Sequence, residues 1–216
     1  MSSSIATSSR STPVRILNVD DHPLILAGLA DTIASQPDLR LVGELEDGEG
    51  IVAAFEALRP DITIMDISMP RTSGLQALEA LRRAYGHARV IMLTTLPGEH
   101  YVRRAIELGA AGFLMKHSLR RDLLDAIRAV HAGNRWIPAD VARTLADHYG
   151  QSSLSEREIE VLRSAAAGNS NKRIGVHLGI AEDTVKAHVR TILAKLDARD
   201  RTHAVALAVK RGIISL

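Results

Sequence analysis

The sequence predicts an α/β domain with a doubly wound, five-stranded parallel sheet, followed by a small all-helical domain. Five apolar, β-branched runs support the sheet, near residues 14–19, 40–45, 61–65, 89–95 and 111–115. Helical patterns such as Leu75, Leu78 and Leu81 separate these runs. Continuous apolar strands alternating with helices indicate a parallel sheet covered on both faces. From residue 153 onward, every periodic segment is helical.

Composition narrows the class of protein. At 216 residues the chain has room for one sizeable domain and a small one. Its 3% aromatic content argues against stacking surfaces for single-stranded nucleic acid. The sequence has no cysteine, so disulfides, thiolate zinc sites and cysteine nucleophiles are excluded, which fits a cytoplasmic location. No apolar run reaches the roughly 18 residues of a membrane span.

Charge is unevenly distributed along the chain. Residues 153–216 hold 11 Lys/Arg against 7 Asp/Glu, whereas residues 1–152 hold 16 against 18. A basic second part behind a mildly acidic first part predicts that only the second part meets nucleic acid.

Breaks in the pattern predict four segments. Residues 1–13 are Ser/Thr-rich and lack the apolar core of a signal peptide, so we expect a disordered tail. Residues 14–132 form the α/β domain, 133–152 a linker with a short helix begun near Pro138, and 153–216 the helical domain. Such a linker permits either a closed or an extended arrangement.

Three carboxylates end two of the predicted strands. Asp66 follows the apolar run at 62–65, and Asp20 and Asp21 follow the run at 14–19. In the strand order 2-1-3-4-5 the crevice lies where strands one and three diverge, so these side chains should converge. Converging carboxylates suit Mg²⁺, and an aspartate can attack a phosphoryl donor.

The ends of the remaining strands complement those acids. Thr94 ends the fourth apolar run and offers a hydroxyl, and Lys116 follows the fifth and offers an ammonium. Both groups stabilise negative phosphoryl oxygens. The sequence therefore predicts a phosphoryl site at one edge of the sheet.

With Met69-Pro70, Gly74 and Ala110-Ala111-Gly112, these residues resemble the receiver domain of two-component response regulators, a flavodoxin-like fold. The resemblance covers about residues 14–132 and implies a role for each site residue. It implies Asp66 as phosphoacceptor, Asp20, Asp21, Asp66 and the backbone carbonyl of Ser68 as Mg²⁺ ligands, and Thr94 and Lys116 as the phosphoryl-sensing pair. Phe113 matches the family's switch aromatic, although a plain core position fits it equally well. His22 receives no role, because Mg²⁺ prefers oxygen ligands.

Helix signals continue through the second domain. Ser155 and Glu158 form a capping box, Gly168 ends that helix, and two further helices joined at Gly179 match a helix-turn-helix. On the second of these helices Lys186 and Arg190 share a face, with Ala187 between them. Such a face suits the DNA major groove, although a solvated amphipathic helix explains this spacing about equally well. Plausible phosphate contacts are Lys172, Thr184 and Arg199.

The offsets of Leu154-Ser155, Ala167-Gly168, Leu178-Gly179 and Thr184-Val185-Lys186 resemble the LuxR-type helix-turn-helix. The resemblance implies that Lys186, Ala187 and Arg190 read bases and that the last helix dimerises, through residues such as Thr202, Val205 and Ala206.

The chain departs from the family pattern at two positions. Ala181 stands where a Ser or Thr usually caps the recognition helix, a loss of about 1 kcal/mol. Glu182 and Asp183, near the positive helix end, should offset part of that loss. Gly175 replaces a helix-favouring Ala, at a cost of about 0.5–1 kcal/mol.

Both resemblances together indicate a response regulator of the NarL/FixJ subgroup, a phosphorylation-activated transcription regulator and not an enzyme. They imply a histidine kinase or other phosphodonor, double-stranded DNA carrying an inverted repeat, and a homodimer when active, with RNA polymerase a further possible partner and no membrane. Three alternatives stay open: a regulator whose receiver does not respond to phosphate, a phosphohydrolase of the haloacid dehalogenase type, and an autoinducer-binding regulator. The second needs Asp-x-Asp, whereas this chain has adjacent Asp20-Asp21. The third needs a ligand-enclosing first domain.

Overall fold

The computed structural model describes residues 12–95, 99–147 and 154–214. The chain divides into two compact units: residues 1–95 with 108–137, and residues 96–107 with 138–216. The expected disordered tail lies almost wholly outside the described residues, and so does the end of the expected linker, from residue 148. Within the part of the chain that is described, no helix is long and apolar enough to cross a membrane.

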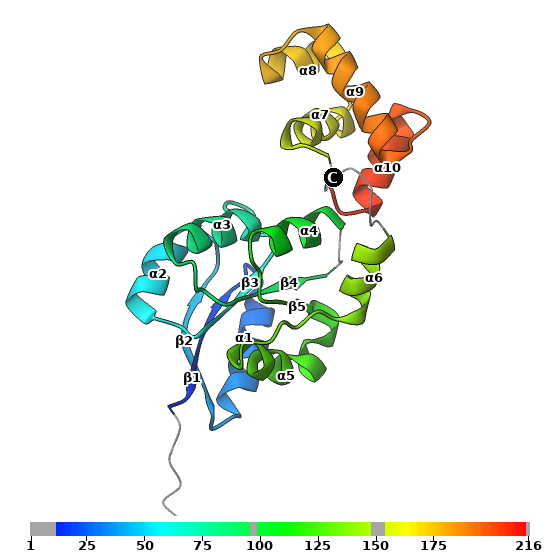
Figure 1. Cartoon of the computed structure of the whole chain (residues 1–216). Coiled ribbons are helices and arrows are strands. Elements are labelled where there is room, and N and C mark those ends of the chain that lie inside the picture. The colour runs from blue at the N-terminus through cyan, green and yellow to red at the C-terminus, as the bar shows by residue number, and fades with distance from the viewer. Residues whose placement is uncertain (1–11, 96–98, 148–153, 215–216) are drawn as a thin grey trace, which may run out of the picture. The chain divides into compact units, whose positions relative to one another are not determined.

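The first unit is built on a five-stranded parallel sheet (Figure 1). Its strands are β1 (Val14–Val19), β2 (Leu39–Leu45), β3 (Ile62–Asp66), β4 (Val90–Thr94) and β5 (Gly112–Met115), in the order β2-β1-β3-β4-β5. The predicted fold class and strand order are therefore confirmed. Val19 pairs with Met65, so Asp20 and Asp66 come next on neighbouring strands at the same level.

Helices cover both faces of this sheet. The helices α1 (Pro23–Ala34) and α5 (Leu119–His131) lie on one face, and α2 (Ile51–Leu58) and α3 (Gly74–Ala84) on the other (Figure 1). A short 3-10 helix, η1 (Lys116–Ser118), leads into α5. The even-numbered residues of β1 and β3 pack toward α1 and α5, in a core that includes Ile16, Ile62, Ile64, Leu29, Ile33, Leu123 and Ile127.

The second unit is helical in its described part. It contains α4 (Glu99–Glu107), α6 (Ala139–Asp147), α7 (Glu156–Ala166), α8 (Asn171–Leu178), α9 (Glu182–Leu196) and α10 (Arg201–Lys210). The predicted capping box is present, because the Ser155 hydroxyl accepts from the Glu158 N–H and the Glu158 carboxylate accepts from the Ser155 N–H. Gly168 and Gly179, with φ of 80° and 66°, follow α7 and α8 in the left-handed conformation that ends a helix.

Gly175 has a packing role that its helix propensity hides. A Cβ at this position would lie 2.7 Å from the carbonyl oxygen of Ile180, in the turn between α8 and α9. The Ile180 N–H in turn donates to the Gly175 carbonyl at 2.9 Å. The glycine thus lets the turn fold back against α8, which corrects the view that Gly175 only weakens the helix.

We therefore expect Gly175→Ala to destabilise the helical domain by about 1–3 kcal/mol, because overpacking outweighs the gain in helix propensity. The matched control is Gly28→Ala in the middle of α1, where a Cβ meets nothing within 4 Å. That control should stabilise its domain by about 0.5–1 kcal/mol. Denaturant unfolding followed by circular dichroism measures both changes. A Gly175→Ala variant more stable than the parent protein would contradict the packing role.

Candidate functional site

The structure brings the predicted carboxylates together at the carboxyl edge of the sheet. Asp20 is fully buried, Asp66 is 2% exposed, and Asp21 is partly exposed. One ligand atom from each, together with one from His22, lies within 4.8 Å of all the others. The convergence expected from strand topology is thus realised.

Lys116 lies between two of these acids. Its Nζ is 2.8 Å from Asp20 Oδ2 and 3.0 Å from Asp66 Oδ2, and its side chain is only 9% exposed. The residue begins η1 directly after β5, so the sheet itself delivers the ammonium to the acids. A single buried cation therefore offsets the repulsion of two buried anions.

Burial and charge oppose each other in this cluster. Burial of the Asp66 carboxylate raises its pKa above the ordinary 3.8, and the Asp20 charge adds to the rise, whereas Lys116 and the Ser68 N–H only reduce it. Burial lowers the pKa of the Lys116 ammonium, but Asp20 and Asp66 outweigh burial and hold this pKa above 10.5. Lys116 therefore stays protonated at neutral pH.

The donor set fits a hard divalent cation. Asp20 Oδ2, Asp21 Oδ1 and Asp66 Oδ2 are buried and have no well-angled hydrogen-bond donor among the described residues. The contacts that Lys116 makes with two of these oxygens are ion pairs by distance alone, and the His22 ring nitrogen Nδ1 lies 2.8 Å from Asp21 Oδ1. Carboxylate oxygens with free lone pairs are the ligands that Mg²⁺ takes in proteins.

His22 belongs to the cluster, although the resemblance to the receiver domain gave it no role. Its Nδ1 lies 3.0 Å from Asp20 Oδ1, 2.8 Å from Asp21 Oδ1 and 3.5 Å from Lys116 Nζ. Its backbone N–H also donates to Asp20 Oδ1 at 2.8 Å. The position of His22, directly after two acids, was the signal available in the sequence.

The other predicted residues of this edge differ in exposure. Thr94 is 5% exposed and stands one residue beyond Leu93, the β4 partner of Asp66. Ser68 is exposed, and its N–H hydrogen-bonds to the Asp66 carboxylate. Phe113 is 1% exposed and pairs with Met92 inside the sheet.

Hydrogen bonds and one close backbone approach hold the loop that follows Asp66. The N–H of Gly74 donates to the Ile67 carbonyl at 3.0 Å, and a Cβ on Gly74 would lie 2.0 Å from the Asp66 carbonyl oxygen. Only glycine permits this approach of α3 to the strand end. Further along the loop, the buried Asp47 carboxylate accepts from Arg71 Nε at 3.1 Å and from the Thr72 N–H at 3.4 Å. No motif in the sequence singled out Asp47.

The predicted base-reading residues share the exposed face of α9. Lys186, Ala187 and Arg190 are exposed, whereas Val185 and Ile192 are buried. Lys186 Nζ lies 3.0 Å from Asp183 Oδ1 and 3.6 Å from Glu182 Oε1. The hydrogen bond to Asp183 raises the pKa of the Lys186 ammonium.

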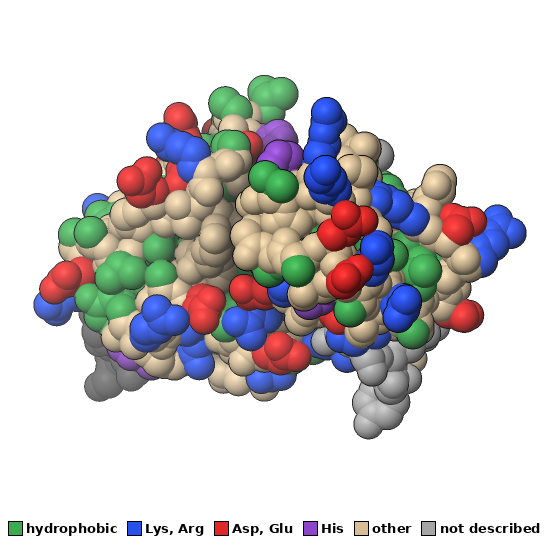
Figure 2. All heavy atoms as spheres, turned by 90° about the horizontal axis from the view of Figure 1, so that it is seen from above, with side chains coloured by type: hydrophobic (Ala, Val, Ile, Leu, Met, Phe, Trp, Pro, Cys, Tyr) green, Lys and Arg blue, Asp and Glu red, His purple; other side chains and the backbone are tan. Residues whose placement is uncertain are grey.

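Glu182 and Asp183 therefore form ion pairs with Lys186, in addition to the favourable interaction with the positive end of α9 that the sequence predicted. As the sequence predicted, Ala181 provides no side-chain cap to α9. On the face shown in Figure 2, basic and acidic side chains likewise lie next to one another.

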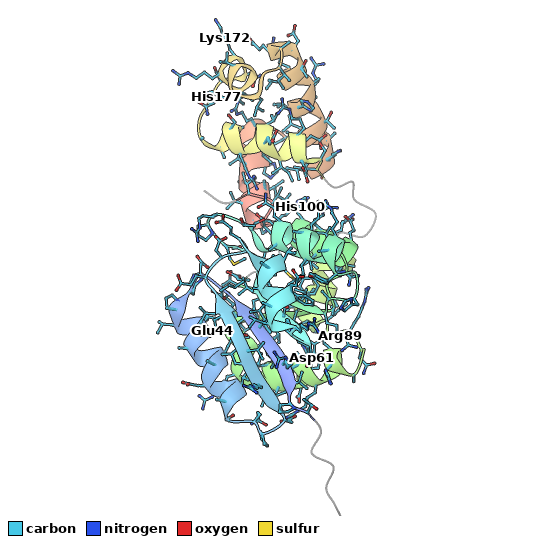
Figure 3. The ribbon with its side chains drawn as sticks, turned by 90° about the vertical axis from the view of Figure 1, so that its left-hand side faces the viewer. Glu44, Asp61, Arg89, His100, Lys172 and His177 are labelled. Atoms are coloured by element: carbon cyan, nitrogen blue, oxygen red, sulfur yellow. The ribbon has the colours of Figure 1, made fainter. Side chains whose placement is uncertain are left out.

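The predicted phosphate contacts are exposed on neighbouring elements. Lys172 lies on α8, Thr184 in the first turn of α9, and Arg199 between α9 and α10. Figure 3 shows Lys172 and His177 pointing outward from α8. Val176, one turn after Lys172, is 76% exposed.

The predicted dimerisation residues lie on α10. Thr202 and Ala206 are exposed, and Val205 is partly buried. Val209 is 36% exposed and continues the line from Thr202 and Ala206 at helical spacing. The sequence analysis did not single out Val209, although this spacing was visible in it.

Comparison with known proteins assigns both parts of the chain. Residues 16–128 match the family model of the response regulator receiver domain, and residues 152–208 match that of the bacterial regulatory proteins of the luxR family. The chain belongs to the response regulators. Its two matched segments are those of a DNA-binding transcriptional regulator and not of an enzyme.

Relatives align with this response regulator over nearly its whole length. The transcriptional regulatory protein LiaR of Bacillus subtilis is 36% identical, with 94% of this chain and 100% of LiaR covered. The nitrate/nitrite response regulator protein NarP of Escherichia coli is 37% identical, with 93% and 96% covered. These matches argue against a phosphohydrolase and against an autoinducer-binding first domain.

Solved structures show the same architecture. The response regulator ChrA of a heme-sensing two-component system is 35% identical, with a TM-score of 0.56 over 94% of this chain and 100% of ChrA. The RcsB response regulator of Salmonella typhimurium is 25% identical, with a TM-score of 0.61 over 93% of this chain and 100% of RcsB.

A partly buried ion pair joins α9 to α7 in the DNA-binding domain of this response regulator. Lys195 Nζ lies 2.8 Å from Glu158 Oε2, and Glu158 is 5% exposed. Burial raises the pKa of the Glu158 carboxylate, but Lys195 and Ser155 outweigh burial and hold this pKa below its ordinary 4.5. The ion pair thus links the C-terminal end of α9 to the capping box of α7.

We expect the domain to lose stability on acidification below about pH 4.5. Because the folded-state pKa of Glu158 is depressed, its contribution is complete above the unfolded-state pKa and is lost as pH falls through the lower folded value. Thermal unfolding measured from about pH 6 downward should show this loss, and Glu158→Gln should remove the part that depends on this carboxylate. An identical pH dependence in the variant would exclude Glu158 as its source.

Proposed function

We propose that Asp66 accepts a phosphoryl group from a histidine kinase and that this modification controls DNA binding. The observation that carries the proposal is the position of Lys116, 2.8 Å from Asp20 and 3.0 Å from Asp66. Membership of the response regulators supports the same role. Asp20, Asp21, Asp66 and the Ser68 carbonyl would hold Mg²⁺, which neutralises charge on phosphoryl oxygens.

The reaction at Asp66 is a displacement at phosphorus. A carboxylate oxygen of Asp66 attacks the phosphorus of the kinase phosphohistidine and forms an acyl phosphate. The phosphorus–nitrogen bond breaks, and its electron pair remains on the imidazole of the kinase. The exposed Ser68 and the partly exposed Asp21 leave this edge open to the donor.

Phosphorylation would change the partners of Lys116 and Thr94. In the unmodified protein the Lys116 ammonium is shared between two carboxylates. Phosphoryl oxygens on Asp66 offer it a stronger anion, and the Thr94 hydroxyl at the end of β4 can donate to them. Both residues would draw their strand ends toward the new group and bias a two-state surface.

The output is DNA binding by the helical domain. We assign the receiver to residues 14–132, the linker to 133–152 and the DNA-binding domain to 153–216. On α9, Lys186, Ala187 and Arg190 would read base edges, while Lys172, Thr184 and Arg199 would contact phosphates. Two copies would pair through α10 at Thr202, Val205 and Ala206, which fits an inverted repeat.

Replacing the phosphoacceptor should uncouple DNA binding from phosphate. Beryllofluoride with Mg²⁺ is expected to strengthen binding of the unmodified protein to an operator selected from random DNA. Asp66→Asn should abolish that gain, because no beryllofluoride adduct can form on an amide. Footprinting with and without beryllofluoride measures the effect. Asp31→Asn, at an exposed position of α1, is the matched control and should keep the full gain. Equal operator affinity of the unmodified protein in both conditions would refute the switch.

Base-reading and phosphate-contacting residues should differ in their effect on specificity. Arg190→Ala is expected to lower affinity for the selected operator roughly 5- to 100-fold more than affinity for scrambled DNA. Lys172→Ala should weaken both about equally and reduce the salt dependence of binding, since it removes one phosphate contact. Fluorescence anisotropy titrations at several salt concentrations measure both quantities. Equal losses on the two DNAs for Arg190→Ala would remove this residue from base reading.

A further inference from the structure

Asn18 is a polar residue in the middle of an apolar strand. It follows Ile16 and Leu17 in β1 and precedes Val19, and it is 0% exposed. Neither Nδ2 nor Oδ1 of its amide has a hydrogen-bond partner among the described residues. Buried side-chain amides are normally paired, so an unpaired one in the central core calls for a functional explanation.

The strand geometry places Asn18 next to the acidic cluster, on the side toward the core. Side chains alternate along a strand, so Asn18 shares a sheet face with Asp20, about 6.6 Å further along β1. Its partner on β3 is Ile64, and Asp66 lies two residues beyond that partner. The amide is therefore directly beneath the two carboxylates that Lys116 bridges.

The polar groups at this place are chemically complementary. Asn18 Nδ2 is a donor without an acceptor among the described residues, and Asp20 Oδ2 and Asp66 Oδ2 are acceptors that contact the Lys116 ammonium by distance alone. An amide with two carboxylates supplies the polar partners that a buried water requires.

Thr63 provides the contrast within the same sheet. Its side chain is also 0% exposed, with an unpaired Oγ1. It pairs with Leu17 and therefore faces the opposite side of the sheet from Asn18. The two buried polar groups thus differ in the one feature that matters here, their position relative to Asp20 and Asp66.

We propose that Asn18 is a positioning residue for the phosphoryl site, whose amide holds the Asp20 and Asp66 carboxylates through hydrogen bonds carried by one buried water. This inference rests on the function proposed above for that site. Groups that orient metal ligands from behind commonly change metal affinity by 10- to 100-fold when removed. The chain retains an amide at this core position because the carboxylates above it need a fixed orientation.

The test uses the full chain with three substitutions of nearly unchanged size: Asn18→Leu, Asn18→Val and Thr63→Val. Calorimetric titration gives the affinity for Mg²⁺ alone, and thermal unfolding gives the stability. Asn18→Leu should raise the melting temperature and weaken Mg²⁺ binding by roughly 10-fold. Thr63→Val should raise the melting temperature and leave Mg²⁺ affinity unchanged. Asn18→Val supplies the same readout if leucine is not accommodated.

The outcomes separate this inference from the function on which it rests. Higher stability with unchanged Mg²⁺ affinity in both Asn18 variants would make Asn18 a plain core residue and overturn the inference, while the phosphoryl switch would stand. Loss of affinity in Thr63→Val as large as in the Asn18 variants would overturn it too, because position would not matter. An unmodified protein that binds no Mg²⁺ would overturn the proposed site and the inference together.

Discussion

The ion triplet of Lys116, Asp20 and Asp66 is the interaction on which the first domain's chemistry depends. Two carboxylates buried at neighbouring strand ends repel each other, and an uncompensated buried charge is expensive. The ammonium of Lys116, within 3.0 Å of both, makes their closeness tolerable. Because Lys116 follows directly after β5, the triplet brings together the ends of three strands, β1, β3 and β5.

The charges of the triplet are balanced well enough to be buried, yet its carboxylate oxygens can still bind a ligand. Carboxylate oxygens there still lack well-angled donors among the described residues, so the site can accept a further cation or a phosphoryl group. A fully paired cluster would have no capacity left for a ligand. Buried polar atoms without a hydrogen-bond partner in a native protein often lie at functional sites. Their contribution to the stability of the fold is smaller because they are reserved for a ligand.

In both domains a glycine allows two backbone segments to approach closely. At Gly74 the start of α3 approaches the Asp66 carbonyl so closely that a Cβ would sit 2.0 Å from it. At Gly175 the turn before the recognition helix folds against α8, with a Cβ position 2.7 Å from Ile180. In each case a residue without a side chain sets the angle at which a functional element leaves the one before it.

The sheet, its strand order and the convergence of Asp20, Asp21 and Asp66 were predictable from the sequence, because apolar runs and helical spacing are local patterns and strand ends in a doubly wound sheet share one edge. The capping box at Ser155 and the uncapped start of α9 at Ala181 were equally local. Features that depend on neighbours distant in sequence came only from the folded chain: the place of His22 in the acidic cluster, the Asp47 contacts with the loop after β3, and the tight turn at Gly175. The buried Asn18 amide, which has no hydrogen-bond partner among the described residues, is a further example, since a pattern of residue types records polarity but not which atoms meet.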